Sequence, residues 1–105
     1  EAGRIELPHI PEGCVHNAHM FWLKARDLEE RTALIDWLKA RGVGSAFHYV
    51  PLHSAPAGRR FGRFHGEDRF TTAESERLLR LPMYYGLTDE DAAHAAAAVT
   101  DFYRR

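Results

Sequence analysis

The sequence predicts an α+β fold, in which a small three-stranded sheet has helices packed on one face. Three observations lead to this prediction: short apolar runs typical of strands, amphipathic stretches preceded by helix N-caps, and their order along the chain, which is strand, helix, strand, loop, helix, strand, helix. A chain of 105 residues suits one domain with one core.

The first strand and the first helix have clear boundaries. Residues 19–25 form an apolar and aromatic run, so we expect a strand there. Asp27 follows as an N-cap, and Glu30 stands three residues later, as in a capping box. Gly42 is placed to end the helix, because glycine readily adopts the left-handed conformation that follows a helix. The apolar face of this helix holds Leu28, Leu34, Ile35 and Leu38.

The middle of the chain is expected to be a strand, a long loop and a short helix. The strand covers 46–50 and stops at Pro51. Residues 52–70 form a loop, and loops of this length inside a compact domain are often functional. Thr71 and Glu74 predict a second capping box, which opens a helix that runs to about residue 79.

The last strand and the last helix complete the predicted fold. The third strand candidate is 81–85, which is weakened by Pro82. Thr88 with Asp91 repeats the N-cap pattern and begins the last helix. The face of this helix that we expect to pack on the sheet holds Ala92, Ala95, Ala96, Val99, Phe102 and Tyr103.

The composition excludes several classes of protein. The net charge of −1 argues against nucleic acid as a partner, because that partner normally requires a basic surface. Cys14 is the one cysteine, which excludes a disulfide within the chain and gives no pair for a zinc site. No apolar run approaches the ~18 residues that cross a bilayer, so no membrane partner is expected. We therefore expect a cytoplasmic protein.

The first sixteen residues have no clear period. They include Pro8, Pro11 and Gly13, which favour an extended segment. We interpret 1–16 as a connector from a missing large domain and 17–105 as a small C-terminal domain. The absence of an initiator methionine fits a piece of a longer protein.

The predicted binding site follows the second strand. His48, Tyr49 and His53 stand where a short apolar strand enters the long loop, and polar and aromatic groups on an anchored loop are typical of a binding site. We therefore predict that these three residues bind substrate. In the alternative interpretation, His48 packs and forms hydrogen bonds on a half-buried strand.

The loop also carries a candidate anion site. Its arginines, together with His53 and His65, could hold a phosphate or a carboxylate, which guanidinium groups bind with two parallel hydrogen bonds. The alternative is a solvated loop in which Glu67 and Asp68 form a turn and offset the arginines. The arginines are Arg59, Arg60, Arg63 and Arg69.

Other chemistries have weaker support. The spacing of the seven histidines does not match a metal motif, so we predict no metal site. A nucleophile would have to be Ser45, Ser54 or Cys14, and no glycine-flanked serine elbow is present. We therefore predict no catalytic residue in this chain.

Three phenylalanines lie in the otherwise polar loop, at positions 61, 64 and 70. We expect them to expose an apolar surface that a partner covers. The chain by itself should then self-associate or have a disordered segment across 53–70.

Several motifs resemble one enzyme family over essentially the whole chain. They begin with Asn17-Ala18-His19-Met20-Phe21 and Phe47-His48-Tyr49-Val50-Pro51-Leu52-His53. They continue with Pro56-Ala57-Gly58, Phe61-Gly62, Phe64-His65-Gly66-Glu67-Asp68-Arg69 and Thr71-Thr72 through Leu81-Pro82. This pattern resembles the C-terminal small domain of the nucleotide-sugar aminotransferases of the DegT/StrS type, which have the type I pyridoxal-phosphate fold. It is similar to the subgroup that makes dTDP-4-amino-4,6-dideoxygalactose.

The resemblance implies a homodimer that uses pyridoxal phosphate. The parent protein would aminate dTDP-4-keto-6-deoxyglucose with glutamate as the donor, for polysaccharide or antibiotic-sugar synthesis. The lysine that holds the cofactor would lie in the large domain. In this chain, Lys24 ends a strand and Lys39 lies on a polar helix face, and neither looks desolvated enough to react. We therefore expect this chain alone to bind no cofactor and to be inactive. The alternative is a binding or dimerisation module without chemistry.

Overall fold

The computed structural model describes residues 3–105, and its fold is α+β as predicted. A three-stranded antiparallel sheet has the strand order β1-β3-β2. The strands are β1 (Phe21–Lys24), β2 (Ala46–Phe47) and β3 (Leu78–Leu81), and the helices are α1 (Leu28–Lys39), α2 (Pro56–Phe61), α3 (Thr71–Arg77) and α4 (Asp89–Arg104).

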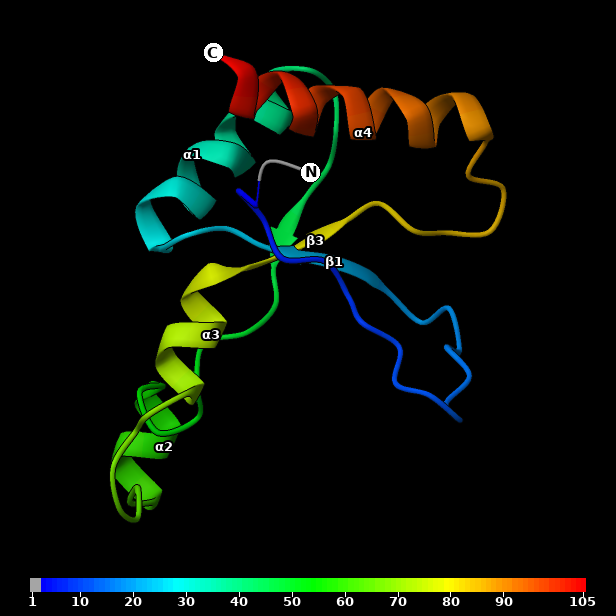
Figure 1. Ribbon diagram of the computed structural model, residues 1–105. Helices are drawn as coiled ribbons and strands as arrows, with labels where there is room; N and C mark the ends of the chain where they lie inside the picture. Colours follow the sequence, from blue (N-terminus) through cyan, green and yellow to red (C-terminus); the bar gives the residue numbers. More distant parts are fainter. Residues whose placement is uncertain (1–2) are drawn as a thin grey trace.

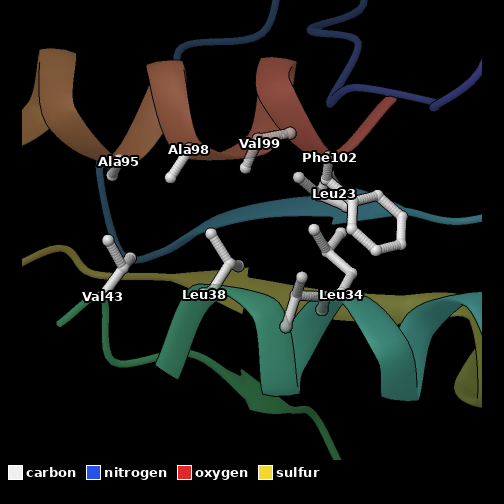
Figure 2. Packing of buried hydrophobic residues seen from close by; sticks show 9 residues of the cluster. Leu23, Leu34, Leu38, Val43, Ala95, Ala98, Val99 and Phe102 are labelled. Carbon is white, nitrogen blue, oxygen red and sulfur yellow. The ribbon is translucent and has the colours of Figure 1, made fainter. Parts of the chain in front are cut away.

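Two layers make up the core. Helices α1 and α4 cover one face of the sheet, whereas α2 and α3 extend away from this pair (Figure 1). Alternation along the strands turns Leu23 of β1 and Leu79 of β3, which are paired in register, toward the helices. Figure 2 shows their partners on the two helices and at the end of α1, which are Leu34, Leu38, Val43, Ala95, Ala98, Val99 and Phe102.

Helix α1 begins and ends as its sequence predicts. The Asp27 carboxylate accepts a hydrogen bond from the Glu30 N–H at 2.9 Å. The Glu30 side chain accepts in return, at 2.7 Å, but from the N–H of Arg26, one position earlier than in a standard capping box. At the other end Gly42 has φ +74°, and the N–H groups of Gly42 and Val43 donate to Lys39 O and Leu38 O. These are the two bonds of a Schellman motif, which returns Val43 to the core.

Helix α4 has the predicted N-cap but a narrower buried stripe than expected. Thr88 accepts from the Asp91 N–H at 3.1 Å, as predicted. The expectation that Ala92 and Ala96 are buried was wrong, and Leu28 of α1 is also exposed. The buried positions of α4 are 95, 98, 99 and 102, because α1 and the sheet contact only one ridge of the helix.

The predicted positions of the later elements need correction. The strand near the third candidate is 78–81 rather than 81–85, and it starts directly after α3, which ends at Arg77. Register explains the shift, because Leu79 and Leu81 must pair with Leu23 and Phe21 on the core face. Pro82 follows the strand, where its missing N–H costs no ladder bond.

The segment between β2 and β3 also differs from the prediction. Strand β2 has only two residues, and the expected loop contains helix α2. The prediction that Thr71 is an N-cap was wrong, since Phe70 is the N-cap of α3 and its side chain forms no capping hydrogen bond. Asp68 accepts from the Thr72 N–H instead, at 3.3 Å. We call residues 48–70 the β2–α3 connection.

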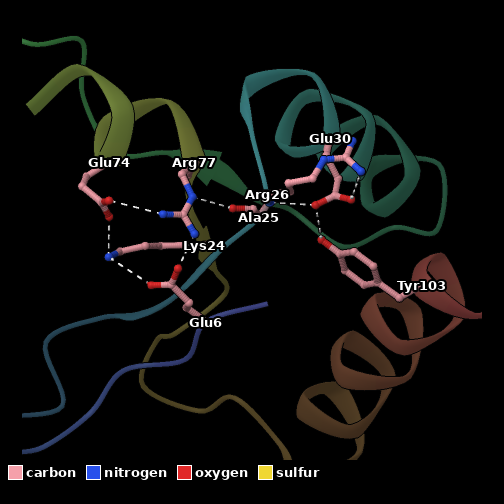
Figure 3. A network of polar contacts seen from close by, with 8 residues as sticks. All are labelled: Glu6, Lys24, Ala25, Arg26, Glu30, Glu74, Arg77 and Tyr103. Atoms are coloured by element: carbon pink, nitrogen blue, oxygen red, sulfur yellow. Dashed lines mark hydrogen bonds and ion pairs between the residues drawn. The ribbon is translucent and has the colours of Figure 1, made fainter. Parts of the chain in front are cut away.

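Part of the expected connector at the N-terminus contacts the small domain. The backbone of Glu6 exchanges two hydrogen bonds with Lys24, of 3.1 and 2.9 Å, and Ile5 packs against the core. Figure 3 shows that the Glu6 carboxylate also pairs with Lys24 and Arg77. Residues 1–2 lie outside the described residues, and the division at residue 16 stays a prediction.

Candidate functional site

The residues predicted to bind substrate lie where the chain leaves the sheet. After Phe47 the chain turns at Pro51, whose carbonyl accepts from the Ser54 N–H at 3.0 Å and from the Ser54 hydroxyl at 3.1 Å. The turn is attached to α3 because the Ser75 hydroxyl donates to the Tyr49 carbonyl at 2.5 Å. Hydrogen bonding to α3, and not the burial of apolar side chains, therefore holds this segment in place.

His53 is held by a carboxylate and an aromatic ring. Its Nε2 lies 2.8 Å from Asp68 Oδ2 and 3.4 Å from the Thr72 hydroxyl, and its ring lies 4.5 Å from that of Phe64. In the neutral ring Nε2 therefore carries the proton, and Nδ1 remains as an acceptor. Asp68 does not offset the arginines, contrary to the solvated-loop prediction, because its partners are His53 and Thr72.

Asp68 is suited to hold His53, because its surroundings favour the ionised form of the Asp68 carboxyl group. The Thr72 hydroxyl donates to Asp68 Oδ2 at 2.5 Å, and this bond is the main reason that the pKa of Asp68 is lowered below its ordinary value. The Thr72 N–H and His53 lower the pKa further. The sequence showed these residues, but nothing in their spacing indicated that they would meet.

His48 and Tyr49 are in ring contact, with 4.6 Å between ring centroids. His48 is half-buried, and its Nδ1 is buried without a hydrogen-bond partner among residues 3–105. The alternative interpretation, a half-buried strand histidine that packs and forms hydrogen bonds, fits the burial of His48, but β2 ends at Phe47 and Nδ1 has no partner in the described chain. Tyr49 is 69% exposed. The three predicted residues thus share one turn, but each has a different environment.

A cavity of about 440 Å³ lies beside Tyr49, between α1, the β2–α3 connection and α3. We call it the arginine cavity, because Arg31 and Arg59 line it. Thr72, which contacts His53, is also in its wall. The other lining residues are Leu28, Phe47, Tyr49, Val50, Pro51, Ser54, Ser75 and Glu76.

Arg31 is the residue of this region that sequence reasoning missed. It is 9% exposed, its Nε donates to Glu76 O at 3.0 Å, and its guanidinium lies 5.2 Å from the centre of the Phe47 ring. Burial lowers its pKa. A signal was present, because Arg31 stands three residues before Leu34 on the buried stripe of α1.

The predicted arginine cluster does not gather at one place. Arg59 lines the arginine cavity, Arg69 donates to Glu67 at 2.9 Å, and Arg60 lies over the ring of Phe61. His65 and Arg63 are exposed in the β2–α3 connection. The alternative of a solvated loop therefore describes most of these residues, and only Arg59 takes part in a cavity.

Neither lysine fits a covalent site for pyridoxal phosphate. Lys24 Nζ lies 2.5 Å from Glu74 and 3.4 Å from Glu6 (Figure 3), and the bond to Glu74 raises its pKa, whereas a reactive lysine needs a lowered one. Lys39 is exposed at the end of α1. Within residues 3–105 no three His, Cys, Asp or Glu side chains gather as metal ligands.

The phenylalanines of the β2–α3 connection are exposed, as predicted. The exposed fractions are 78% for Phe61, 44% for Phe64 and 72% for Phe70. In the described part of the chain, no helix is long and apolar enough to cross a membrane.

Comparison with known proteins shows which family the chain matches. The DegT/DnrJ/EryC1/StrS aminotransferase family matches residues 2–100. A protein of Acidithiobacillus ferrooxidans named UDP-N-acetyl-3-dehydro-alpha-D-glucosamine 3-aminotranferase is 31% identical over 98 residues, which make up 90% of this chain and 25% of that protein.

Two solved structures share the fold. DesV of S. venezuelae, in complex with a ketimine intermediate, has a TM-score of 0.81 and 30% identity over 99% of this chain and 28% of that chain. The PMP form of Spr1654 from Streptococcus pneumoniae has a TM-score of 0.77 and 25% identity over 98% of this chain and 27% of that chain. The chain spans about a quarter of the length of these relatives. Since the family match covers nearly every residue, the chain belongs to the DegT/DnrJ/EryC1/StrS aminotransferase family.

Proposed function

We propose that this chain is the C-terminal small domain of a pyridoxal-phosphate-dependent sugar aminotransferase. The parent converts dTDP-4-keto-6-deoxyglucose to dTDP-4-amino-4,6-dideoxygalactose with glutamate as the amino donor, in the cytoplasm. A large domain of the same protein holds the cofactor. This chain shapes the substrate cleft through His48, Tyr49 and His53 and contributes to the interface of a homodimer.

The observation that carries this proposal is the environment of His53. Asp68 and Thr72 fix the ring, and Nδ1 remains available to accept a hydrogen bond from a ligand, for which a sugar hydroxyl is suited. A fixed acceptor on a loop, next to an exposed tyrosine, can orient a polar substrate. His48 supports the same role, because its buried Nδ1 lacks a partner among the described residues.

Two observations support the proposal that a large domain holds the cofactor while this chain contacts the substrate. Members of the family that share this fold are about four times as long as this chain, which leaves room for a large domain. The carboxylates around Lys24 disfavour covalent attachment of the cofactor to this chain. The choice of the dTDP sugar rests on the motifs from Phe47 to Pro82 and not on the relatives, since the Acidithiobacillus ferrooxidans protein is named for a UDP sugar.

A second candidate function is a dimerisation or binding module without chemistry. The exposure of Phe61 and Phe70 favours it, since several exposed rings on one segment mark an interface. A reading frame that encodes a large domain with a cofactor lysine, upstream of residue 1, supports the transaminase. A start codon directly before it supports the module.

The test is His53→Ala in the parent protein. We expect kcat/KM for the sugar nucleotide to fall about five- to a hundred-fold, the effect of leaving the substrate hydroxyl without its acceptor at a cost of roughly 1–3 kcal/mol, while the cofactor spectrum is unchanged. Tyr49→Phe should have a smaller effect, because it removes only a hydroxyl. His65→Ala is the matched control, since His65 is exposed in the same connection. An unchanged kcat/KM for His53→Ala would refute the role of His53.

A further inference from the structure

The arginine cavity contains a buried cation, Arg31, on which Glu76 acts electrostatically but with which it forms no ion pair. Arg31 is 9% exposed, yet no ion pair joins it to a carboxylate among residues 3–105. Its one hydrogen bond uses Nε, so both terminal nitrogens remain without a protein partner in the described chain. These two nitrogens are not among the fully buried polar atoms, so they keep access to solvent although most of the Arg31 side chain is buried, and a ligand in the cavity can reach them.

The cavity wall offers few other free donors. The hydroxyl groups of Ser54, Thr72 and Ser75 already donate to Pro51 O, to Asp68 and to Tyr49 O. The donors that remain are the guanidinium groups of Arg31 and Arg59 and the hydroxyl of Tyr49. Arg59, like Arg31, forms no ion pair among the described residues.

The charge of the wall favours an acceptor with negative charge. Two arginines and one glutamate, Glu76, line the cavity, so its formal charge is +1. Arg31 packs against the ring of Phe47, and this cation–π contact compensates part of the free-energy cost of burying the cation. The ring accepts no hydrogen bond in the plane of the guanidinium group. Planar guanidinium groups match the paired oxygens of phosphate and carboxylate.

We propose that the arginine cavity is an oxyanion site, in which Arg31 and Arg59 bind a phosphate or carboxylate group and Tyr49 donates a further hydrogen bond. Arg31 is the fixed part of the site, because Glu76 O and Phe47 hold it. Arg59 comes from α2 and lines the same cavity. This inference does not rest on the proposed function, because it concerns only contacts within this chain.

The test is a titration of the 105-residue chain followed by NMR. Sodium phosphate and sodium acetate are added in separate arms, and sodium chloride at matched ionic strength is the control. We expect saturable shifts of the Arg31 and Arg59 Nε–H signals and of the backbone amides of 47–54 and 72–76. The arm that saturates at the lower concentration identifies phosphate or carboxylate as the preferred group.

Variants separate a site from general attraction to a basic surface. Arg59→Gln should weaken binding about ten- to a hundred-fold, as expected for the loss of one charge-assisted hydrogen bond. Arg60→Gln removes the same charge from the next residue of α2, which does not line the cavity, and should change affinity less than about two-fold. The exposed side chain of Arg59 forms no hydrogen bond in the described chain, so its replacement should leave the fold intact.

Three results would overturn the proposal. The first is the absence of saturable shifts in both anion arms. The second is equal shifts in the chloride control. The third is an equal loss of affinity in Arg59→Gln and Arg60→Gln.

Discussion

The core and the β2–α3 connection hold their residues in different ways. Among residues 3–105, every buried hydrophobic side chain lies in 23–43, at 79 or in 95–102. The connection instead exposes its large apolar side chains and is attached by hydrogen bonds such as Ser75 to Tyr49 O. A segment with few buried contacts opens at low free-energy cost and is suited to contact a ligand or partner. The exposed residues are Tyr49, Val50, Leu52, Phe61, Phe64 and Phe70.

The largest expected difference between the two regions comes from the same substitution made in each. Leu79→Ala removes a fully buried side chain from the central strand and should lower the free energy of unfolding by about 2–5 kcal/mol. Leu52→Ala, in the connection, removes a side chain that is 84% exposed and should change it by less than about 0.5 kcal/mol. Urea unfolding measures both. Similar losses in the two variants would show that the connection is part of the core.

A smaller effect is expected at Gly58, which makes a tight contact within the connection. A Cβ on Gly58 would collide with the carbonyl oxygen of Leu52, so Gly58→Ala should move α2 away from the Pro51 turn, at a cost of roughly 1–3 kcal/mol. Backbone amide shifts should be confined to about residues 50–62. Gly44→Ala is the control, because a Cβ there meets nothing within 4 Å. Amide shifts that spread to Leu79 after Gly58→Ala would contradict the independence of the two regions.

The smallest expected effect is a change of pKa at Asp68. Thr72→Val removes the hydroxyl that is the main cause of the lowered pKa, so the pKa of Asp68 should rise toward its ordinary value. Because the native pKa is lowered, the carboxylate stabilises the fold above the pKa of the unfolded chain, and this contribution is lost as pH falls through the native value. A pH titration of the Asp68 carboxyl carbon by NMR measures the shift. Thr100→Val, at an exposed position of α4, should leave it unchanged.

The sequence by itself determined the elements whose signals are local. Asp27 and Thr88 each cap the N–H three residues ahead, and Gly42 ends α1, because these contacts involve neighbours along the chain. Alternating apolar residues and these caps were sufficient for the α+β class. The exposure of the phenylalanines was also predictable, since their segment is otherwise polar.

Only the tertiary structure decided the contacts between distant residues. The place of β3 depends on pairing with β1, more than fifty residues away, so the local pattern around Pro82 was misleading. His53 meets Asp68 and Thr72 because the turn at Pro51 lies against α3, to which Tyr49 O is bonded. Arg31 meets Glu76 O because α3 packs beside α1. Such contacts depend on how elements pack and not on spacing along the chain, which is why the sequence predicted a role for His53 but neither its partners nor the arginine cavity.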